Sequence, residues 1–368
     1  MKTSLIHRKE LDGIRGCAAL SVLLLHIVKT AMSGATAGSV TAGWSFAGRV
    51  ADMGSFGVDV FFVLSGFLIT SLSLKDRSKP HFFYNFYTRR IFRIQPIYLL
   101  HLLVAWFLLP GSHMYVFLAL IFIVNFDEYF HAQDVGPAWT LAIEEQFYLI
   151  WPQVIRRCSL KNIYRISIGV MLFSAGLRMG MISILHHASQ RSTWYRFDGL
   201  AIGALLACQW MGADEGVSRS TGLFLKFFNS RVMLIAGVIW FAGWTVGYFT
   251  GITVNLGMAM FSVNYLVYRA IRFIMQHPGS KPFGWLGSRP LTYLGLLSYS
   301  MYMFHAFFLY IYDVYIAPPS LALPQFFLRA AFVTACTAVI CVLIRILVEK
   351  PLVPVRDRFL KREPRSAA

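Results

Sequence analysis

Long apolar segments separated by short basic ones constrain this chain more than any other feature. A helix needs about 20 apolar residues to cross the hydrocarbon core of a bilayer. Of the 368 residues, 57% are hydrophobic and only 14% are charged, whereas soluble domains carry about a quarter charged residues. A soluble fold of this length has too little interior to bury so much apolar sequence. We therefore predict an all-α, polytopic bundle of transmembrane helices. The candidate spans are residues 11–32, 57–74, 94–109, 114–126, 139–155, 166–185, 195–211, 232–249, 252–274, 291–312 and 325–348.

The basic residues predict the orientation of the bundle. The formal net charge is +17, and Lys and Arg collect near the N-terminus, in segments 75–93, 156–165 and 269–289, and after residue 350. This is the pattern of cytoplasmic loops in a membrane protein. We expect both termini in the cytoplasm, the acidic 127–138 loop outside, and a multi-pass protein of the inner membrane. No zinc knuckle or basic–aromatic repeat accompanies the charge, so nucleic acid is not an expected partner.

The number of crossings poses a parity problem. Three apolar segments lie between the basic clusters 75–93 and 156–165, yet two cytoplasmic loops are separated by an even number of crossings. Either 114–126, the shortest, or 139–155, which contains two glutamates, is then re-entrant or merged with a neighbour. About ten crossings remain. With no internal repeat, the simplest organisation is one domain over residues 1–368, with a short basic tail from about residue 350 and no appended soluble domain.

Two features of the sequence have alternative interpretations. Lys2, Arg8 and Lys9 precede the first apolar run and small residues follow Ala31, as in a signal peptide. We favour a retained span, because the run is long enough to cross and contains candidate catalytic residues. The five cysteines are odd in number, form no C-x-x-C and lie mostly in apolar runs. They are predicted to be small buried hydrophobes and not a disulfide framework or metal site.

Ionisable side chains within apolar runs are costly and mark candidate functional sites. Arg15 and His26 are eleven residues apart, about three helical turns, and so share one face of a helix. An imidazole in an apolar site can take a proton from a hydroxyl near neutral pH. The alternative, equally good for this pair alone, is that His26 hydrogen-bonds a neighbouring helix. Asp12 can pair with Arg15 where the helix starts.

Arg90 and Arg93 form a second candidate pair. Their spacing of three residues puts both guanidinium groups on one helical face. Placed where a span begins, they can bind phosphate oxygens bidentately. Spacing alone favours the alternative, an ordinary basic anchor that contacts lipid headgroups.

The third candidate is the run W-T-L-A-I-E-E-Q-F-Y from Trp139 to Tyr148. Side chains of the adjacent Glu144 and Glu145 project about 100° apart on a helix, so at most one faces a given site. That carboxylate can orient a histidine or bind a substrate hydroxyl. The alternative is a helix N-terminus near the outer surface, where acids complement the helix dipole.

Two further polar stretches lie inside apolar runs. Residues 298–305, S-Y-S-M-Y-M-F-H, end in His305, which can serve chemistry or equally well bond a neighbouring helix. Residues 57–66 contain small residues suited to close packing, together with Ser65 and an unexplained charge, Asp59. The chain has no P-loop, nucleophile elbow or H-E-x-x-H motif, so nucleotide hydrolysis, serine hydrolysis and metal-dependent proteolysis have no support.

Taken in order, these motifs resemble acyltransferase family 3, a family of membrane O-acyltransferases of bacteria and eukaryotes. The resemblance covers nearly the whole chain, and its departures are Thr140 and Ala142, where serine is common, and Ala306, where proline is frequent. The matching blocks are E-L-D-G-I-R at 10–15 with His26, residues 57–69, the R-x-x-R of Arg90 and Arg93, residues 139–148, R-F-D-G-L at 196–200, residues 298–305 and E-K-P at 349–351.

The resemblance implies transfer of an acyl group, usually acetyl from acetyl-CoA, to a carbohydrate hydroxyl. The acceptor would be a lipopolysaccharide O-antigen, an exopolysaccharide or another envelope glycan, presented free or lipid-linked. It implies His26 and Arg15 as the catalytic pair, Glu145 as an acceptor-binding or orienting group, and Arg90 and Arg93 as donor-binding residues. The supporting residues would be Asp12, Asp59, Ser65, Trp139, Glu144, Tyr148 and His305.

The implied chemistry needs no permanently bound cofactor and no metal, since acyl-CoA is a co-substrate. Two other functions remain open. One is acylation of a small molecule such as a macrolide. The other is secondary transport of a polar solute, although the chain lacks the repeats and broken helix pairs typical of transporters.

Overall fold

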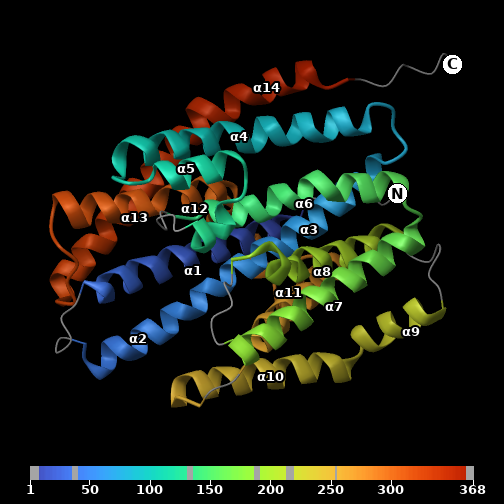
Figure 1. Ribbon diagram of the computed structural model, residues 1–368, viewed down its shortest axis with the longest axis horizontal. Helices are drawn as coiled ribbons and strands as arrows, with labels where there is room; N and C mark the ends of the chain where they lie inside the picture. Colours follow the sequence, from blue (N-terminus) through green and yellow to red (C-terminus); the bar gives the residue numbers. More distant parts are fainter. Residues whose placement is uncertain are drawn as a thin grey trace.

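The computed structural model describes residues 8–34, 40–130, 136–185, 191–212, 219–252 and 255–361, and these residues form helices without any β-strand. Most helices run along the long axis of the molecule (Figure 1). In chain order they are α1 (Lys9–Ser33), α2 (Ala42–Asp52), η1 (Met53–Ser55), α3 (Phe56–Asp76), α4 (Phe82–Leu108), α5 (His113–Leu120), η2 (Val124–Phe130), α6 (Ala138–Arg157), α7 (Leu160–Leu185), α8 (Thr193–Gly212), α9 (Arg219–Phe228), α10 (Arg231–Thr250), α11 (Leu256–Gln276), η3 (Gly284–Gly287), α12 (Arg289–Tyr315), α13 (Leu323–Ile344), η4 (Arg345–Glu349) and α14 (Lys350–Phe359).

The long helices identify a membrane protein. Six helices or continuous helical stretches in the described ranges are long and apolar enough to cross a bilayer. Four other helices of 20 residues or more, α6, α7, α8 and α11, fall outside that set. One of them, α8, is buried along residues 198–208. The six stretches are Lys9–Ser33, Ala42–Asp76, Phe82–Leu108, Arg231–Thr250, Arg289–Tyr315 and Leu323–Phe359.

The structure shows that residues 114–126, the shortest of the three apolar segments, do not form a membrane-spanning helix. The helix there, α5, has only eight residues, which extend about 12 Å and cannot cross a bilayer of about 30 Å. A 3-10 segment, η2, follows it. The remaining long helices between the two basic clusters are α4 and α6, which is an even number. Consistently, the Arg156 side chain donates a hydrogen bond to the carbonyl oxygen of Arg77, so both clusters lie at one end of the bundle.

Two predicted boundaries were wrong, and two short helices were not predicted. The third span was expected to begin at residue 94, but α4 already begins at Phe82, because Phe82 and Phe86 are buried and extend its packed face. Arg90 and Arg93 therefore lie inside a helix. The last span does not end at residue 348, since a π-helical turn and α14 continue it to Phe359. The short helices α2 and α9 were not predicted. With 11 and 10 residues, these helices are too short to be found by a search for membrane-spanning segments.

Close glycine contacts bring two helix pairs together. A Cβ on Gly295 of α12 would lie 1.9 Å from the carbonyl oxygen of Asp12, and one on Gly66 of α3 would lie 2.0 Å from that of Leu200. Only glycine lets helix backbones approach so closely. The pairs α1–α12 and α3–α8 are therefore in direct backbone contact, as the small residues at 57–66 suggested.

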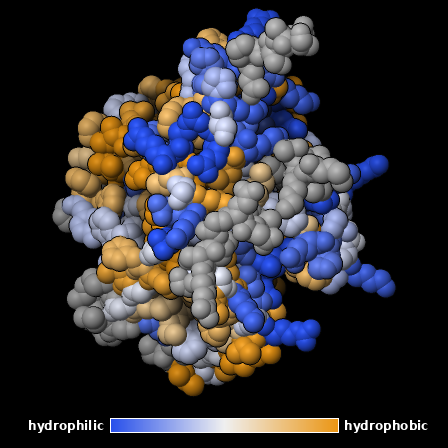
Figure 2. Space-filling model, turned by 90° about the vertical axis from the view of Figure 1, so that its right-hand side faces the viewer, coloured by the Kyte–Doolittle hydropathy of each residue, from blue (hydrophilic) through white to orange (hydrophobic). Residues whose placement is uncertain are grey.

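The charged residues gather at one end of the molecule. Figure 2 views the end that lies on the right in Figure 1, and hydrophilic side chains project from it. The α14 helix also ends there (Figure 1). Asp134 of the acidic loop, Lys2 and the tail beyond residue 361 lie outside the described residues. Cys208 and Cys341 are buried and the other three cysteines half-buried, each as a free thiol.

Candidate active site

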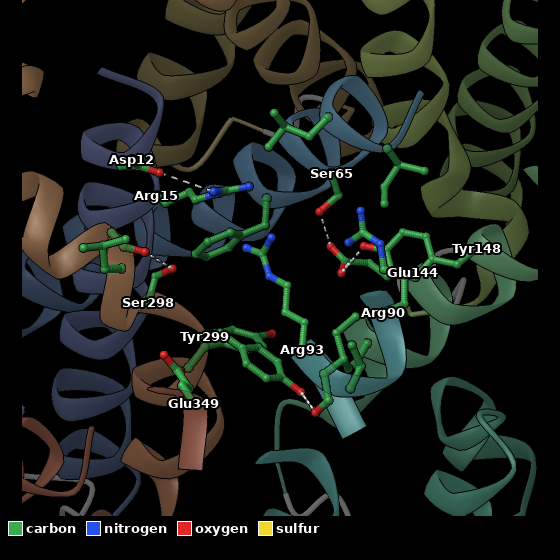
Figure 3. Close-up of a pocket in the computed structure, with 18 of the residues that line it drawn as sticks. Asp12, Arg15, Ser65, Arg90, Arg93, Glu144, Tyr148, Ser298, Tyr299 and Glu349 are labelled. Atoms are coloured by element: carbon green, nitrogen blue, oxygen red, sulfur yellow. Dashed lines mark hydrogen bonds and ion pairs between the residues drawn. The ribbon is translucent and has the colours of Figure 1, made fainter. Parts of the chain in front are cut away.

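A cavity of about 710 Å³ is lined by the first turns of α1, nearly the whole length of α3, the first half of α4, and parts of α6, α12, η4 and α14. Its lining extends from Arg8, Lys75 and Arg356 at the basic end to Phe61, Thr140 and Tyr302 deeper among the helices. Figure 3 shows its polar side chains converging from several helices. The ionisable side chains that line it are Arg8, Asp12, Arg15, Lys75, Arg90, Arg93, Glu144, Tyr148, Tyr299, Tyr302, Arg345, Glu349 and Arg356.

The cavity is electropositive. Seven Lys or Arg side chains face three Asp or Glu side chains. Arg93 extends into the middle of the cavity (Figure 3), and among the described residues neither it nor Arg90 has an ion pair. The Arg90 guanidinium lies 4.9 Å from the centroid of the Tyr148 ring and 5.7 Å from that of Phe86. This stacking holds the planar group while its N–H donors stay available to an anion.

Arg15 faces the same cavity from α1. Its guanidinium lies 3.4 Å from a carboxylate oxygen of Asp12, so the ion pair expected from the i, i+3 spacing is present. The structure therefore brings together Arg15 from the first motif and Arg90 and Arg93 from the R-x-x-R motif, although α1 and α4 are far apart in the sequence.

Of the two adjacent glutamates, Glu144 lines the cavity and Glu145 does not. The Glu144 carboxylate accepts hydrogen bonds from the Ser65 hydroxyl at 2.7 Å and the Tyr148 hydroxyl at 2.9 Å (Figure 3). Glu145 has one buried carboxylate oxygen without a hydrogen-bond partner. The helical geometry of residues 139–148 thus selects one glutamate, as expected, but the one at the cavity is Glu144.

The two candidate histidines lie against each other. The Nε2 atom of His305 is 3.0 Å from the Nδ1 atom of His26, and the His305 Nδ1 atom is 3.0 Å from the Met301 carbonyl oxygen. A carbonyl only accepts, so His305 carries its proton on Nδ1, and in the neutral ring its Nε2 must accept from His26 Nδ1–H. Neutral His26 is then unprotonated at Nε2, the form that a general base requires.

The end of α1 that carries His26 is held by a buried arginine. Arg329 donates to the Ile27 carbonyl oxygen at 3.0 Å and to the Thr30 hydroxyl at 2.8 Å. It also pairs with Asp313 at 2.6 Å. Thr30 in turn donates to the His26 carbonyl oxygen. Sequence reasoning missed this anchor, although a charged residue within the apolar run 325–348 is the kind of signal that marks one.

Two aromatic rings separate the cavity from the histidine pair. Phe61 of α3 and Tyr302 of α12 line the cavity, whereas His26 and His305 do not. The ring centroids of Phe61 and Tyr302 are 6.0 Å apart, and the Tyr302 ring is 6.2 Å from that of His305. The cavity thus ends one aromatic layer short of the histidines.

Asp59 and Trp139 belong to a neighbouring buried cluster. Asp59 pairs with Arg196 at 3.1 Å, and the Arg196 guanidinium lies 5.4 Å from the centroid of the Trp139 ring. A second buried pair, Arg178 with Asp198 at 2.6 Å, lies nearby on α7 and α8. Neither Asp59 nor Trp139 lines the cavity. The charge at Asp59 is therefore explained by a structural partner on α8.

Comparisons with known proteins point to one enzyme class. Residues 8–346 of the chain match the family model of acyltransferase 3, which is described as an acyltransferase domain. The O-acetyltransferase OatA of Staphylococcus aureus (strain NCTC 8325) is 28% identical over 325 residues, which cover 80% of this chain and 49% of that protein. A provisionally named O-acetyltransferase of strain COL, SACOL0978, is 31% identical over 226 residues, which cover 54% of this chain and 34% of that protein. The chain spans about half the length of the first of these relatives. No solved structure matches it significantly.

Proposed function

Since the chain belongs to acyltransferase family 3 and is a membrane-embedded acyltransferase, we propose that it transfers an acyl group, acetyl in the first place, from acyl-CoA to a hydroxyl of an envelope glycan. The relatives' names, which say O-acetyltransferase, support acetyl. The observation that carries the proposal is the electropositive cavity leading toward a hydrogen-bonded histidine pair. One domain, extending over the whole 368-residue chain, performs the reaction.

We propose that the ten long helices all cross the membrane. Ten helices of 20 to 27 residues occur in the described ranges, and each is long enough for a crossing of about 30 Å. With all ten crossing the inner membrane, both chain ends lie on one side. The basic end, where the cavity opens, then faces the cytoplasm under the positive-inside rule, which is the side where acyl-CoA is made.

The donor binds through its phosphates. Arg90 and Arg93 present forked donors to phosphate oxygens, and Arg15 adds a third guanidinium from the opposite wall. These contacts leave the pantetheine arm to extend along the cavity toward the histidines. Arg15 and His26 are eleven residues apart, which corresponds to about 16 Å along α1, a length that an extended arm can cover.

His26 acts as the general base. Its Nε2 atom takes the proton from the acceptor hydroxyl while that oxygen attacks the thioester carbonyl carbon. The carbon–sulfur bond then breaks, and the departing CoA thiolate takes the proton from His26. The products are an O-acyl ester and CoA thiol. His305 keeps His26 in the required tautomer and accepts a hydrogen bond from its Nδ1–H throughout. A positive group such as Arg15 stabilises developing negative charge.

Glu144 is the acidic residue we assign to the reaction, in place of Glu145. It already accepts hydrogen bonds from Ser65 and Tyr148, and it lies in the cavity wall opposite Arg15 (Figure 3). A carboxylate held in this way can orient a substrate hydroxyl or the guanidinium groups around it. Asp59 and Trp139 do not line the cavity but both contact Arg196, Asp59 through an ion pair and Trp139 through its ring.

The test uses membranes that contain the wild type, His26→Ala or His277→Ala. The control His277 is exposed and does not line the cavity. The membranes receive acetyl-CoA labelled in the acetyl group, and base-labile label is measured in the glycan, lipid and small-molecule fractions. We expect ester label in the glycan fraction for the wild type and the control, and a loss of at least about 100-fold for His26→Ala. Equal labelling by a folded His26→Ala variant would refute the assignment of the base.

The same fractions separate the other candidate functions. Ester label confined to small molecules would indicate a soluble acceptor such as a macrolide. Solute uptake by the membranes without ester formation would indicate a transporter.

A further inference from the structure

The deep end of the cavity is closed by the rings of Phe61 and Tyr302. Both line the cavity, from α3 and α12 respectively, with centroids 6.0 Å apart. This is the spacing of rings in contact. The Tyr302 side chain also interacts with Thr140, a cavity-lining residue of α6. Side chains of three helices therefore meet in one layer.

This layer lies directly below the histidine pair. Tyr302 is three residues from Tyr299, which lines the cavity, and three residues from His305. These positions stack along one side of α12. Phe61 packs against an apolar cluster of α1, α12 and α13 that includes Ile27, the residue after His26, and Met301, the residue before Tyr302. A group that travels from the arginines to His26 must therefore pass the two rings.

The acyl group is the part of the donor that reaches this layer. The thioester carbonyl carbon must come within about 3.5 Å of the attacking oxygen, and that oxygen must be within hydrogen-bond reach of His26. The phosphates stay with Arg90 and Arg93 at the other end. The acyl carbons lead the thioester past Phe61 and Tyr302, so each extra methylene must fit between the two rings and the histidine pair, in space that the rings limit.

We propose that Phe61 and Tyr302 select the acyl group by size and restrict the enzyme to acetyl-sized donors. The selection acts on the donor of the function proposed above and rests on it. In an apolar pocket, one methylene more or less changes the preference between two substrates by about 10- to 200-fold. A two-carbon extension, from acetyl to butanoyl, is therefore strongly disfavoured while both rings are present.

The experiment compares two donors in four proteins. Membranes with wild type, Phe61→Ala, Phe61→Leu or Phe92→Ala receive labelled acetyl-CoA or labelled butanoyl-CoA, and the rates of base-labile ester formation give a butanoyl-to-acetyl ratio. Phe92 is the matched control, because it also lines the cavity but packs against Phe359 of α14. We expect the ratio to rise about tenfold or more in both Phe61 variants and to keep the wild-type value in Phe92→Ala.

Each other outcome counts against the proposal. An unchanged ratio in Phe61 variants that still transfer acetyl overturns it, as does a wild type that uses butanoyl-CoA as readily as acetyl-CoA. If Phe61→Ala does not accumulate, Phe61→Leu, which keeps a branched apolar side chain, decides. Loss of both activities in well-folded Phe61→Leu also overturns it. A wild type that forms no ester from either donor refutes the proposed function, and the size selection falls with it.

Discussion

At the scale of single residues, one hydrogen bond determines what His26 can do. The His305 Nδ1–H donates to the Met301 carbonyl oxygen, and the His26 Nδ1–H donates to His305 Nε2, so a backbone carbonyl of α12 sets the tautomer of a histidine on α1. A histidine whose far nitrogen is held in this way presents the other nitrogen as a base, as in the orientation of catalytic histidines by a third group.

This relay predicts a graded effect at His305. His305→Leu removes the acceptor for His26 Nδ1–H, so we expect kcat for acetyl transfer to fall about 100-fold with little change in the KM for acetyl-CoA. His305→Gln restores a side-chain oxygen that can accept this bond, so we expect it to recover part of kcat. Steady-state kinetics of both variants beside His277→Ala provide the measurement. Equal losses in the Leu and Gln variants would indicate a packing role alone.

At the scale of elements, the contact between α1 and α12 positions the histidine pair. Gly16 and Gly295 let the two backbones touch, with a Cβ on Gly16 lying only 2.5 Å from the Leu291 carbonyl oxygen. The contact extends along both helices to His26 and His305, where Arg329 of α13 holds the far end of α1. The geometry of the histidine pair thus depends on helix packing rather than on any loop.

We therefore expect Gly295→Ala to separate α1 from α12. Its methyl group would meet the Asp12 carbonyl oxygen at 1.9 Å, and such overpacking costs about 1–3 kcal/mol. Thermal unfolding of the purified protein in detergent should show a lower midpoint for this variant. Gly243→Ala on α10 is the control, since a Cβ there has no neighbour within 4 Å. A Gly295→Ala midpoint equal to that of the control would contradict the packing argument.

At the scale of the whole molecule, the charge distribution favours one end for the entry of the proposed donor. The cavity lies at the end that carries the basic clusters (Figure 2), whereas the α12–α13 connection lies at the opposite end (Figure 1). A polyanionic donor is attracted to the first end and not to the second. Under the proposed function the same basic residues serve topology and binding, so spacing alone could not separate the two roles for Arg90 and Arg93.

The topology is testable with two introduced thiols. His81→Cys lies in the exposed turn between α3 and α4, and Pro318→Cys lies exposed between α12 and α13. We expect a membrane-impermeant thiol reagent to label His81→Cys in inside-out vesicles and Pro318→Cys in right-side-out vesicles, with the wild type as the blank. The positive-inside rule gives this direction. The opposite pattern, or labelling of both from one side, would show that the proposed orientation or the number of crossings is wrong.

Much of the fold was predictable because its determinants are local. Hydropathy located α1 to within two residues at its start, since the apolar run is continuous, and helical periodicity placed Asp12 beside Arg15. Helical periodicity also required that only one of Glu144 and Glu145 face a given site. The start of α4 was missed because basic side chains interrupt the apolar run, although buried Phe82 and Phe86 continue the packed face.

The sequence by itself determined that this chain is a helical membrane protein, which residues share a helix face, and which family it belongs to. Only the tertiary structure decided that His26 meets His305, that Glu144 and not Glu145 reaches the cavity, and that Phe61 and Tyr302 close it. The physical reason is distance along the chain. Helix formation and hydropathy act over a few turns, whereas His26 and His305 are 279 residues apart and meet only because glycines on α1 and α12 allow the two backbones to touch.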